Sequence, residues 1–490
     1  MEGGAAIDLS RRRHVHFLGI CGYAVSGAAL TVQGMGHRVT GSDDNAYPPT
    51  TTILTEAGIH WMNRSDPANI DRNGTPDLVV VGNQTRPNNP ELLHVQALHL
   101  PVCSEPELWE LLTRDRLRLT VTGTHGKTTT ASLLAWILHS AGLDPGWRLG
   151  ATTRDLGTSA ALGSTLAAAP FVFEGDEYTT APWDRRPKFL LTHPRAAAVT
   201  VLEHDHPDVY PTLEDYLRPF DQLVDGMPDD GLLVLNADDP ACMRLAERAR
   251  CPVQTFGRDA GTLHVDGATV QEQGSDGTVR QRFPVVDLRP GATERYDVTL
   301  SLPGAHNRMN ALAAILLAAE GGASVEACLS ACASFLGPTR RFEVKGKYGG
   351  ITVVDDYGHH PAEVAAVVRA AVERHPGQRL IVVNVPHTYS RTLAMLEDYT
   401  RCYRGADLVL VGPIEAARER GQTATVSNAD VAARARTSVP RAGTVASAQE
   451  AVDAVVSEAR AGDVVLCVAL GGFDGFAERL AAALRERYGD

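Results

Sequence analysis

The segment at residues 117–135, LRLTVTGTHGKTTTASLLA, constrains the fold of this chain more than any other. Its first residues alternate between apolar and polar and predict a buried strand, and the residues from Thr128 onward predict a helix. Two glycines open a tight loop between them. Such a loop lets backbone N–H groups converge on phosphate oxygens, and the helix N-terminus adds partial positive charge. The segment predicts a phosphate-binding loop, with an ordinary turn before a helix as the alternative.

Individual residues of this loop have separate predicted roles. Lys127 can reach the terminal phosphates of a nucleotide, and the hydroxyl of Thr128 can hold Mg²⁺. The spacing departs from the usual pattern, because Thr122 stands where a glycine is common and the loop glycine follows it. We expect the nucleotide to contact the whole loop: Gly123, Thr124, His125, Gly126, Lys127, Thr128 and Thr129.

Length and charge limit the remaining possibilities. A chain of 490 residues is too long for one core and predicts about two to four domains. A formal net charge of -13 argues against a nucleic-acid-binding surface, which needs a basic face. Residues 1–13 lack the apolar core of a secretory signal, and no apolar run is long enough to span a bilayer. We expect a cytoplasmic protein that binds neither nucleic acid nor membrane.

The N-terminal segment has a second glycine-rich turn. Residues 14–27, HVHFLGICGYAVSG, predict a strand, a turn and a helix, and further strands are predicted at residues 37–40 and 77–83. This pattern is typical of a mononucleotide-binding βαβ unit. The glycine spacing departs from G-x-G-x-x-G, so an NAD site is not expected, and a purely structural turn remains the alternative. The glycines and strand-end polar residues of this unit are Gly19, Gly22, Gly27, Asp43 and Asn83.

Acidic residues follow two strands after the phosphate loop. Residues 171–177, FVFEGDE, predict a strand that ends in carboxylates, and residues 196–210 predict a strand that runs into EHDHPDVY. Hard cations take oxygen ligands at the carboxyl edge of a parallel sheet, so Mg²⁺ ligands are expected here. Solvated loop acids are the alternative for the first cluster, and a zinc site is the alternative for the second.

The rest of the central segment has a different pattern. Short alternating segments at residues 262–302 predict an antiparallel patch that flanks the parallel sheet, with a hairpin turn at residues 274–277. Residues 303–317 open with turn residues and continue as an alanine-rich helix. His306 and Asn307 at the start of this helix either cap it or contact a nucleotide base.

A third α/β unit is predicted after residue 337. Its predicted strands are at residues 351–354, 380–385, 407–411 and 464–468, and its predicted helices include 362–373 and 392–403. The first strand ends in DDYGHHP and the second in PHTYSRT. Because ligands bind at strand ends in open parallel sheets, both clusters are candidate binding residues.

Together these motifs resemble those of the Mur ligases, the ATP-dependent amide-bond-forming enzymes of peptidoglycan assembly. The resemblance rests on HFLGICG with GSD, GTHGKTTT, EGDE, EHDHPDVY, GAHNRMNALAA, RRFE and DDYGHHP, in the order of the family. It implies an α/β fold of three domains. These are a Rossmann-like UDP-sugar-binding domain at residues 1–112, a central P-loop ATP-binding domain at 113–337 and a Rossmann-like acceptor-binding domain at 338–490.

The resemblance also implies the chemistry. ATP donates its γ-phosphoryl group to a carboxylate, and an amine then displaces phosphate from the acyl phosphate. ATP and Mg²⁺ are the implied cofactors, and the implied catalytic residues are Lys127, Glu174 and His206. The implied metal ligands are Thr128 for one Mg²⁺, and Glu174 with His206 for a second. The implied ATP contacts outside the phosphate loop are His306, Asn307, Arg341 and Asp356. The last two residues come from the C-terminal domain, so the site is complete only after domain closure.

The implied donor is UDP-N-acetylmuramate, bound by Gly19, Gly22, Gly27, Asp43 and Asn83. The subgroup that uses this donor lacks the lysine that many family members place after the metal histidine, and no lysine occurs here at residues 207–230. One enzyme of the subgroup adds L-alanine, and the other adds the tripeptide L-Ala-γ-D-Glu-meso-diaminopimelate. DDYGHHP and PHTYSRT are similar to the first enzyme, whereas HFLGICG and GGFDGF are similar to the second.

We expect L-alanine as the acceptor, because acceptor choice should follow the acceptor pocket. The implied pocket residues are Tyr357, His359, His360, His387 and Arg391. A folylpolyglutamate-synthase-like ligase is a further alternative, but the glycine-rich N-terminal unit argues against it. A non-catalytic nucleotide-binding protein would keep the fold and lose the metal ligands, which are all present here.

Overall fold

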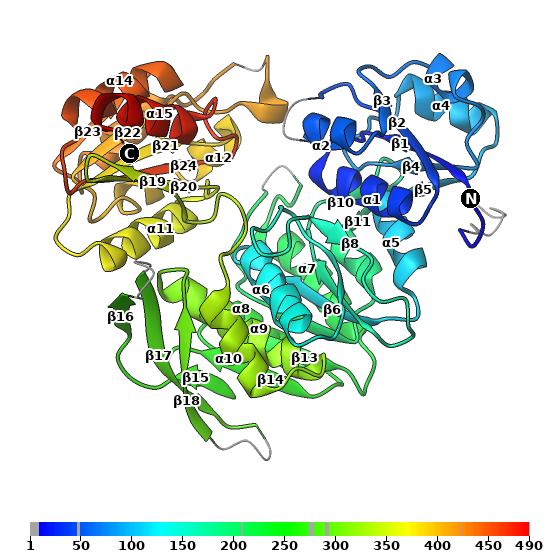
Figure 1. The fold of residues 1–490 in the computed structure, drawn as a ribbon, viewed down its shortest axis with the longest axis horizontal. Helices are drawn as coiled ribbons and strands as arrows, with labels where there is room; N and C mark the ends of the chain where they lie inside the picture. The colour runs from blue at the N-terminus through cyan, green and yellow to red at the C-terminus, as the bar shows by residue number, and fades with distance from the viewer. Residues whose placement is uncertain are drawn as a thin grey trace.

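The computed structural model describes residues 9–46, 50–206, 209–273, 279–289, 294–421 and 423–489. Three large sheets lie in three consecutive units of the chain, and β10 and β11 form a separate two-stranded sheet (Figure 1). Figure 1 shows the blue N-terminal unit and the yellow to red C-terminal unit on opposite sides above the cyan and green central unit. The predicted α/β fold of three domains is confirmed. None of the helices within the described ranges is long and apolar enough to cross a membrane.

The N-terminal sheet is parallel throughout, in the order β3-β2-β1-β4-β5. Its central strands β1 and β4 are buried along almost their whole length, as expected for a parallel sheet covered on both faces. The elements of this unit are β1 (His14–Leu18), α1 (Tyr23–Gly34), β2 (Arg38–Ser42), α2 (Thr50–Glu56), β3 (His60–Met62), α3 (Ala68–Arg72), β4 (Leu78–Val81), α4 (Pro90–Ala97), β5 (Val102–Ser104) and α5 (Glu105–Thr113).

The central sheet has the order β16-β17-β15-β14-β13-β12-β6-β9-β7-β8, and β18 pairs with β17. The predicted antiparallel patch is confirmed, because β17 pairs antiparallel with β15, β16 and β18. The patch continues the parallel sheet instead of flanking it separately, because β15 also pairs in parallel with β14. The hairpin turn predicted at residues 274–277 lies outside the described residues.

The central unit is the largest of the three. Its strands are β6 (Leu117–Thr122), β7 (Gly146–Arg148), β8 (Ala160–Ala161), β9 (Pro170–Glu174), β10 (Thr179–Ala181), β11 (Asp184–Pro187), β12 (Ala196–Val199), β13 (Leu232–Asn236), β14 (Val253–Gly257), β15 (Leu263–Val265), β16 (Val270–Gln273), β17 (Val279–Asp287) and β18 (Glu294–Leu300). Its helices are α6 (Lys127–Ser140), α7 (Leu213–Asp225), α8 (Pro240–Met243), α9 (Ala305–Glu320) and α10 (Val325–Ser334). One hydrophobic core joins α6 and α9 to the sheet, where the small alanines of α9 allow close approach.

The C-terminal sheet has the order β19-β20-β24-β21-β22-β23, and only β19 is antiparallel to its neighbour. Its strands are β19 (Glu343–Tyr348), β20 (Ile351–Asp356), β21 (Leu380–Val385), β22 (Leu408–Val411), β23 (Arg441–Thr444) and β24 (Val464–Ala469). Its helices are α11 (Pro361–Arg374), α12 (Tyr389–Ala394), α13 (Asn428–Ala435), α14 (Ala448–Glu458) and α15 (Phe476–Tyr488). Separate hydrophobic cores lie on the two faces of this sheet.

The helix predicted at residues 392–403 is wrong. Helix α12 ends at Ala394, and the chain continues through a short 3₁₀ turn at Asp398–Thr400. Tyr399 and Tyr403 are fully buried in the C-terminal core, and the hydroxyl of Tyr403 donates to Asn384 Oδ1 at 2.7 Å. Tertiary packing of these tyrosines therefore outweighs local helix propensity.

The N-terminal unit is joined to the central unit by a buried contact. The rings of Trp109 on α5 and Phe171 on β9 lie 5.4 Å apart. Beside them, the guanidinium of Arg148 donates to both carboxylate oxygens of Glu105, each at 3.0 Å. A bidentate buried pair of this kind fixes orientation as well as distance. These contacts fix α5 of the N-terminal unit against β7 and β9 of the central unit.

Candidate active site

The phosphate loop lies between β6 and α6, as predicted. Gly123 and Gly126 have φ angles of 125° and 84°, which favour glycine. A Cβ atom on Gly126 would lie 2.4 Å from Asn310 Oδ1, and one on Gly123 would lie 2.4 Å from Thr200 Oγ1. Both glycines are therefore required by backbone conformation and by close packing. The loop amides precede the N-terminus of α6, a geometry suited to phosphate oxygens.

Lys127, the first residue of α6, is held by the loop and by a carboxylate. Its Nζ donates to the carbonyl oxygens of Gly123 and Thr124 at 2.7 and 3.0 Å and forms an ion pair of 2.9 Å with Glu177. Burial alone would lower the pKa of Lys127, but attraction to the Glu177 carboxylate raises it above its usual value. The ammonium group is therefore charged at neutral pH and is oriented toward the phosphate loop.

Thr128 and Glu174 form a pair of oxygen ligands. The hydroxyl of Thr128 donates to Glu174 Oε1 at 2.7 Å, and the amide of Gly150 donates to Glu174 Oε2 at 2.6 Å. Both side chains are buried beside the phosphate loop. A hydroxyl next to a carboxylate fits a hard cation such as Mg²⁺, which prefers oxygen ligands. The residues present therefore fit the cation that the sequence predicts.

His206 contacts Glu177, the same carboxylate that pairs with Lys127. Its Nε2 lies 3.1 Å from Glu177 Oε1, and its Nδ1 lies 2.9 Å from the hydroxyl of Tyr178. His206 thus contacts Glu177 in this structure, and its predicted role as a Mg²⁺ ligand together with Glu174 stays a prediction. The backbone of His206 has a positive φ of 56°, which is rare outside glycine and is typical of functional sites.

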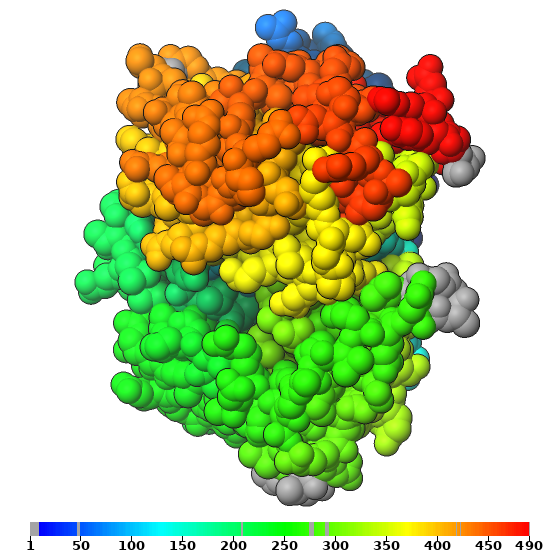
Figure 2. Space-filling view, turned by 90° about the vertical axis from the view of Figure 1, so that its left-hand side faces the viewer, coloured from blue at the N-terminus to red at the C-terminus, as the bar shows by residue number. Residues whose placement is uncertain are grey.

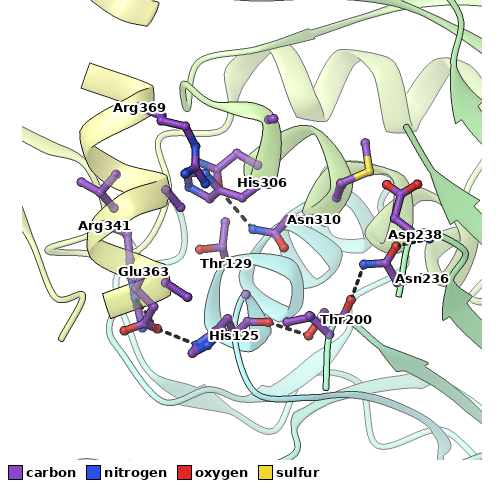
Figure 3. A pocket seen from close by; sticks show the side chains of 18 of the residues that line it. His125, Thr129, Thr200, Asn236, Asp238, His306, Asn310, Arg341, Glu363 and Arg369 are labelled. Carbon is purple, nitrogen blue, oxygen red and sulfur yellow. Dashed lines mark hydrogen bonds and ion pairs between the residues drawn. The ribbon is translucent and has the colours of Figure 1, made fainter. Parts of the chain in front are cut away.

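A cavity of about 360 Å³ lies between the central and C-terminal units. Figure 2 shows a recess where the green surface of the central unit meets the yellow surface of the C-terminal unit. Figure 3 shows side chains from both units pointing into the cavity. The structure places seven of the predicted ATP contacts on its lining: His125, Gly126, Thr129, His306, Asn307, Arg341 and Asp356.

His306 and Asp356 are two of the titratable groups in this cavity whose pKa values are shifted. Burial, together with the nearby Arg369, lowers the pKa of His306 to about 4, so its imidazole is neutral at pH 7. Burial raises the pKa of Asp356 to about 6, although the carboxylate accepts the backbone amides of Phe342 and Gly358. A neutral ring and a hydrogen-bonded carboxylate suit the base and ribose of a nucleotide better than its phosphates.

His125 links the phosphate loop to the C-terminal unit. Its Nδ1 lies 3.2 Å from Glu363 on α11 (Figure 3). Its Nε2 lies 3.3 Å from Glu203. Burial alone would lower the pKa of His125, but hydrogen bonds to Glu203 and Glu363 raise it to about 9. The imidazole is therefore charged at neutral pH and bridges two carboxylates that belong to different units.

The predicted acceptor residues divide into two groups. Arg391 lies at the centre of one group, where its Nη1 donates to His387 Nδ1 at 3.3 Å and the rings of His359 and His387 are 5.5 Å apart. Tyr357 stands next to His359 at 6.1 Å. His360 points elsewhere, because its Nδ1 caps α11 and its ring packs against His125 at 4.8 Å.

Family comparison accounts for nearly the whole chain. Residues 14–116 match the model of the Mur ligase family catalytic domain, residues 121–318 match the Mur ligase middle domain, and residues 340–471 match the Mur ligase glutamate ligase domain. The protein belongs to the Mur ligase family. The resemblance stated from the sequence motifs is confirmed, and the protein is an ATP-dependent ligase that forms an amide bond.

Curated relatives of this Mur ligase extend over the full chain. The UDP-N-acetylmuramate–L-alanine ligase of Chloroflexus aggregans is 36% identical over 96% of this chain and 98% of its own length. The enzyme of the same name from Kineococcus radiotolerans is 37% identical over 99% of each chain. Among solved structures, a murein peptide ligase from Psychrobacter arcticus is 29% identical over 96% of this chain and 98% of its own, with a TM-score of 0.70. The UDP-N-acetylmuramate-alanine ligase of Thermotoga maritima shares the fold, with a TM-score of 0.77, 23% identity and coverage of 97% of this chain and 100% of its own.

The N-terminal unit of this Mur ligase contains a separate cavity of about 540 Å³. Four of the five predicted UDP-sugar contacts line it: Gly19, Gly22, Asp43 and Asn83. Gly27 does not line this cavity. It lies within α1, where a Cβ atom would come 3.0 Å from Ala160, and it lines a different cavity of about 720 Å³ together with Ala160 and Ala161 of β8. Its predicted contact with the UDP-sugar stays a prediction.

The structure adds residues that sequence reasoning missed. Glu177 lies between Lys127 and His206, although the sequence offered it only as one of three acids at a strand end. Other additions to the two cavities are Arg86, Thr200, Asn236, Asp238, Arg258 and Asn310. Asn236 and Asp238 lie at the polar end of β13, and no local sequence pattern indicates that they line the same cavity as residues of α9.

Proposed function

We propose that this Mur ligase joins the lactyl carboxylate of UDP-N-acetylmuramate to L-alanine in peptidoglycan precursor synthesis. The observation that carries the proposal is similarity over the full chain to L-alanine ligases from two organisms, at 36% and 37% identity. Such a match includes the acceptor unit as well as the ATP-binding unit. A cytoplasmic location is part of the proposal, because ATP and nucleotide sugars are cytoplasmic substrates.

The three substrates are assigned to three domains. The UDP-sugar binds in the N-terminal cavity of the domain at residues 1–112, where four predicted contacts converge. ATP binds in the cavity between the domain at residues 113–337 and the domain at 338–490. The acceptor binds the group around Arg391, whose guanidinium suits a carboxylate.

The reaction consists of two transfers. A carboxylate oxygen of the donor attacks the γ-phosphorus of ATP, which releases ADP and forms an acyl phosphate. The neutral amine of the acceptor then attacks the carbonyl carbon, phosphate leaves with the C–O bonding electrons, and the new amide nitrogen loses a proton. Lys127 stabilises the charge on the transferring phosphoryl group, since its ammonium already faces the loop carbonyls.

Thr128, Glu174 and His206 are the proposed Mg²⁺ ligands. The first two fit this role directly, because their oxygens lie 2.7 Å apart beside the phosphate loop. When bound, Mg²⁺ supplies neutralisation of phosphate charge. Glu177 supports the site by holding Lys127 and His206 in place.

A second acceptor is supported by one specific observation. The solved murein peptide ligase from Psychrobacter arcticus is 29% identical to this chain, and the match covers 96% of this chain. The donor and the chemistry would be the same, and the acceptor would be the tripeptide L-Ala-γ-D-Glu-meso-diaminopimelate.

The experiment that separates these functions is phosphate release from ATP, Mg²⁺ and UDP-N-acetylmuramate. L-alanine is added to one reaction and the tripeptide to another. Release driven by L-alanine supports the proposed function, and release driven only by the tripeptide replaces it with the second. No release with either acceptor would contradict the proposed donor.

A further inference from the structure

Both ring nitrogens of His206 are engaged in this structure. Nδ1 lies 3.0 Å from Nη2 of Arg391 and 2.9 Å from the hydroxyl of Tyr178. An arginine guanidinium can only donate hydrogen bonds, so Nδ1 carries no proton and accepts. The ring proton is then on Nε2, which donates to Glu177 Oε1 at 3.1 Å.

A metal ion needs one imidazole nitrogen with a free lone pair. Ligation through Nδ1 requires the lone pair that Arg391 occupies. Ligation through Nε2 requires the ring proton to move to Nδ1, where it would face the N–H groups of Arg391. Tyr178 can rotate its hydroxyl and become an acceptor, but Arg391 cannot. Whichever nitrogen of His206 is the ligand, Arg391 must first withdraw.

Arg391 is held in this position by groups that a substrate can replace. Its Nη2 donates to Asp205 Oδ1 at 2.7 Å, and its side chain is 3% exposed. Arg391 belongs to α12 of the C-terminal unit, whereas Asp205 and His206 follow β12 of the central unit. An amino acid or peptide acceptor carries a carboxylate of the same kind as that of Asp205, and a guanidinium binds such groups in a bidentate manner.

We propose that Arg391 is a positioning residue that couples acceptor binding to metal binding. In the empty enzyme it binds Asp205 and His206 and prevents His206 from ligating a cation. The carboxylate of the acceptor draws Arg391 away and frees the imidazole. The inference rests on the proposed function, which assigns His206 to Mg²⁺ and Arg391 to the acceptor. By linkage, each ligand then raises the affinity for the other by the same factor.

The test is the binding of Mn²⁺, a spectroscopic substitute for Mg²⁺, to the full-length protein. Free Mn²⁺ is followed by electron paramagnetic resonance in the presence of a non-hydrolysable ATP analogue and without UDP-N-acetylmuramate, so that no turnover occurs. We expect L-alanine to tighten Mn²⁺ binding by roughly fivefold or more, the lower range of ordinary allosteric coupling. L-alaninamide, which lacks the carboxylate, should leave Mn²⁺ binding unchanged. An equal response to both compounds, or no response to L-alanine, overturns the proposal.

A pair of variants tests the same coupling from the side of the protein. Arg391→Met should bind Mn²⁺ more tightly than the wild type in the absence of L-alanine and should not respond to L-alanine. Arg404→Met removes the same charge from an exposed position of the same unit and should behave like the wild type. Equal Mn²⁺ affinities of the two variants overturn the proposal. If Arg391→Met does not fold, the wild-type comparison of L-alanine with L-alaninamide still decides.

Phosphate release separates this inference from the proposed function. If L-alanine drives phosphate release but does not tighten Mn²⁺ binding, the role of Arg391 is wrong and the proposed function stands. If only the tripeptide drives release, the proposed acceptor is wrong, and the tripeptide replaces L-alanine in the Mn²⁺ titration. Tighter Mn²⁺ binding in the presence of the tripeptide then supports the role of Arg391, and unchanged Mn²⁺ binding overturns it.

Discussion

Replacement of Lys127 by alanine should separate the catalytic role of this residue from its structural role. The ammonium is 2.9 Å from the Glu177 carboxylate, and the two side chains are 13% and 4% exposed. Breaking a buried ion pair by removing one partner costs about 3–5 kcal/mol, because the remaining charge is left without compensation. His206 still contacts Glu177 at 3.1 Å, so we expect a loss at the lower end, about 3 kcal/mol.

The double variant Lys127→Ala/Glu177→Gln provides the matched control. It removes the unpaired charge and should recover most of the lost stability, measured by urea unfolding without ligands. Neither variant should release phosphate from ATP with both substrates present, because the phosphate contact of Lys127 is absent from both. Near-normal turnover of Lys127→Ala would refute the phosphate-binding role. Equal destabilisation of the single and double variants would refute the ion-pair argument.

Three further predictions follow from the site. Gly126→Ala should weaken ATP binding at least tenfold in a calorimetric titration, because the new Cβ atom would lie 2.4 Å from Asn310 Oδ1. Gly142→Ala is the control and should leave ATP binding unchanged, because Gly142 also has a positive φ, 73°, but no atom lies within 4 Å of the new Cβ. His206→Ala should raise the Mg²⁺ concentration needed for half-maximal phosphate release; an unchanged Mg²⁺ titration would contradict the ligand role. The pKa of His125 is raised to about 9, so its contribution to stability is complete below its unfolded value of about 6.5 and is lost as the pH rises through 9. The thermal stability of His125→Gln should therefore fall below that of the wild type at pH 6 and approach it at pH 10, and a gap independent of pH would contradict this.

The phosphate loop was predictable because its determinants are local. The alternation of Leu117, Leu119 and Val121 indicates a buried strand, and glycine is the residue that tolerates the positive φ of the loop. Motif order along the chain then identified the family, since the relative positions of several motifs depend on the order of the domains. The three-domain α/β fold was predictable from the predicted strands and helices that alternate along the chain.

Local patterns did not predict how α12 ends or which residues meet in the site. The segment at residues 392–403 has the composition of a helix, but buried Tyr399 and Tyr403 draw the chain into the C-terminal core. Gly27 has the expected motif position, yet its place in α1 is set by contact with Ala160 in a different unit. In both cases the deciding contact is distant in sequence.

By itself, the sequence determined the types of chemical group available for catalysis. The glycines of the phosphate loop, a phosphate-binding lysine and the acids at strand ends are recognisable from residue type and spacing. Only the tertiary structure decided how these groups pair. Glu177 contacts both Lys127 and His206, and Arg391 of the C-terminal unit reaches His206 of the central unit. Such pairings depend on the packing of one unit against another, and the free energy of that packing is spread over many contacts that no local pattern encodes.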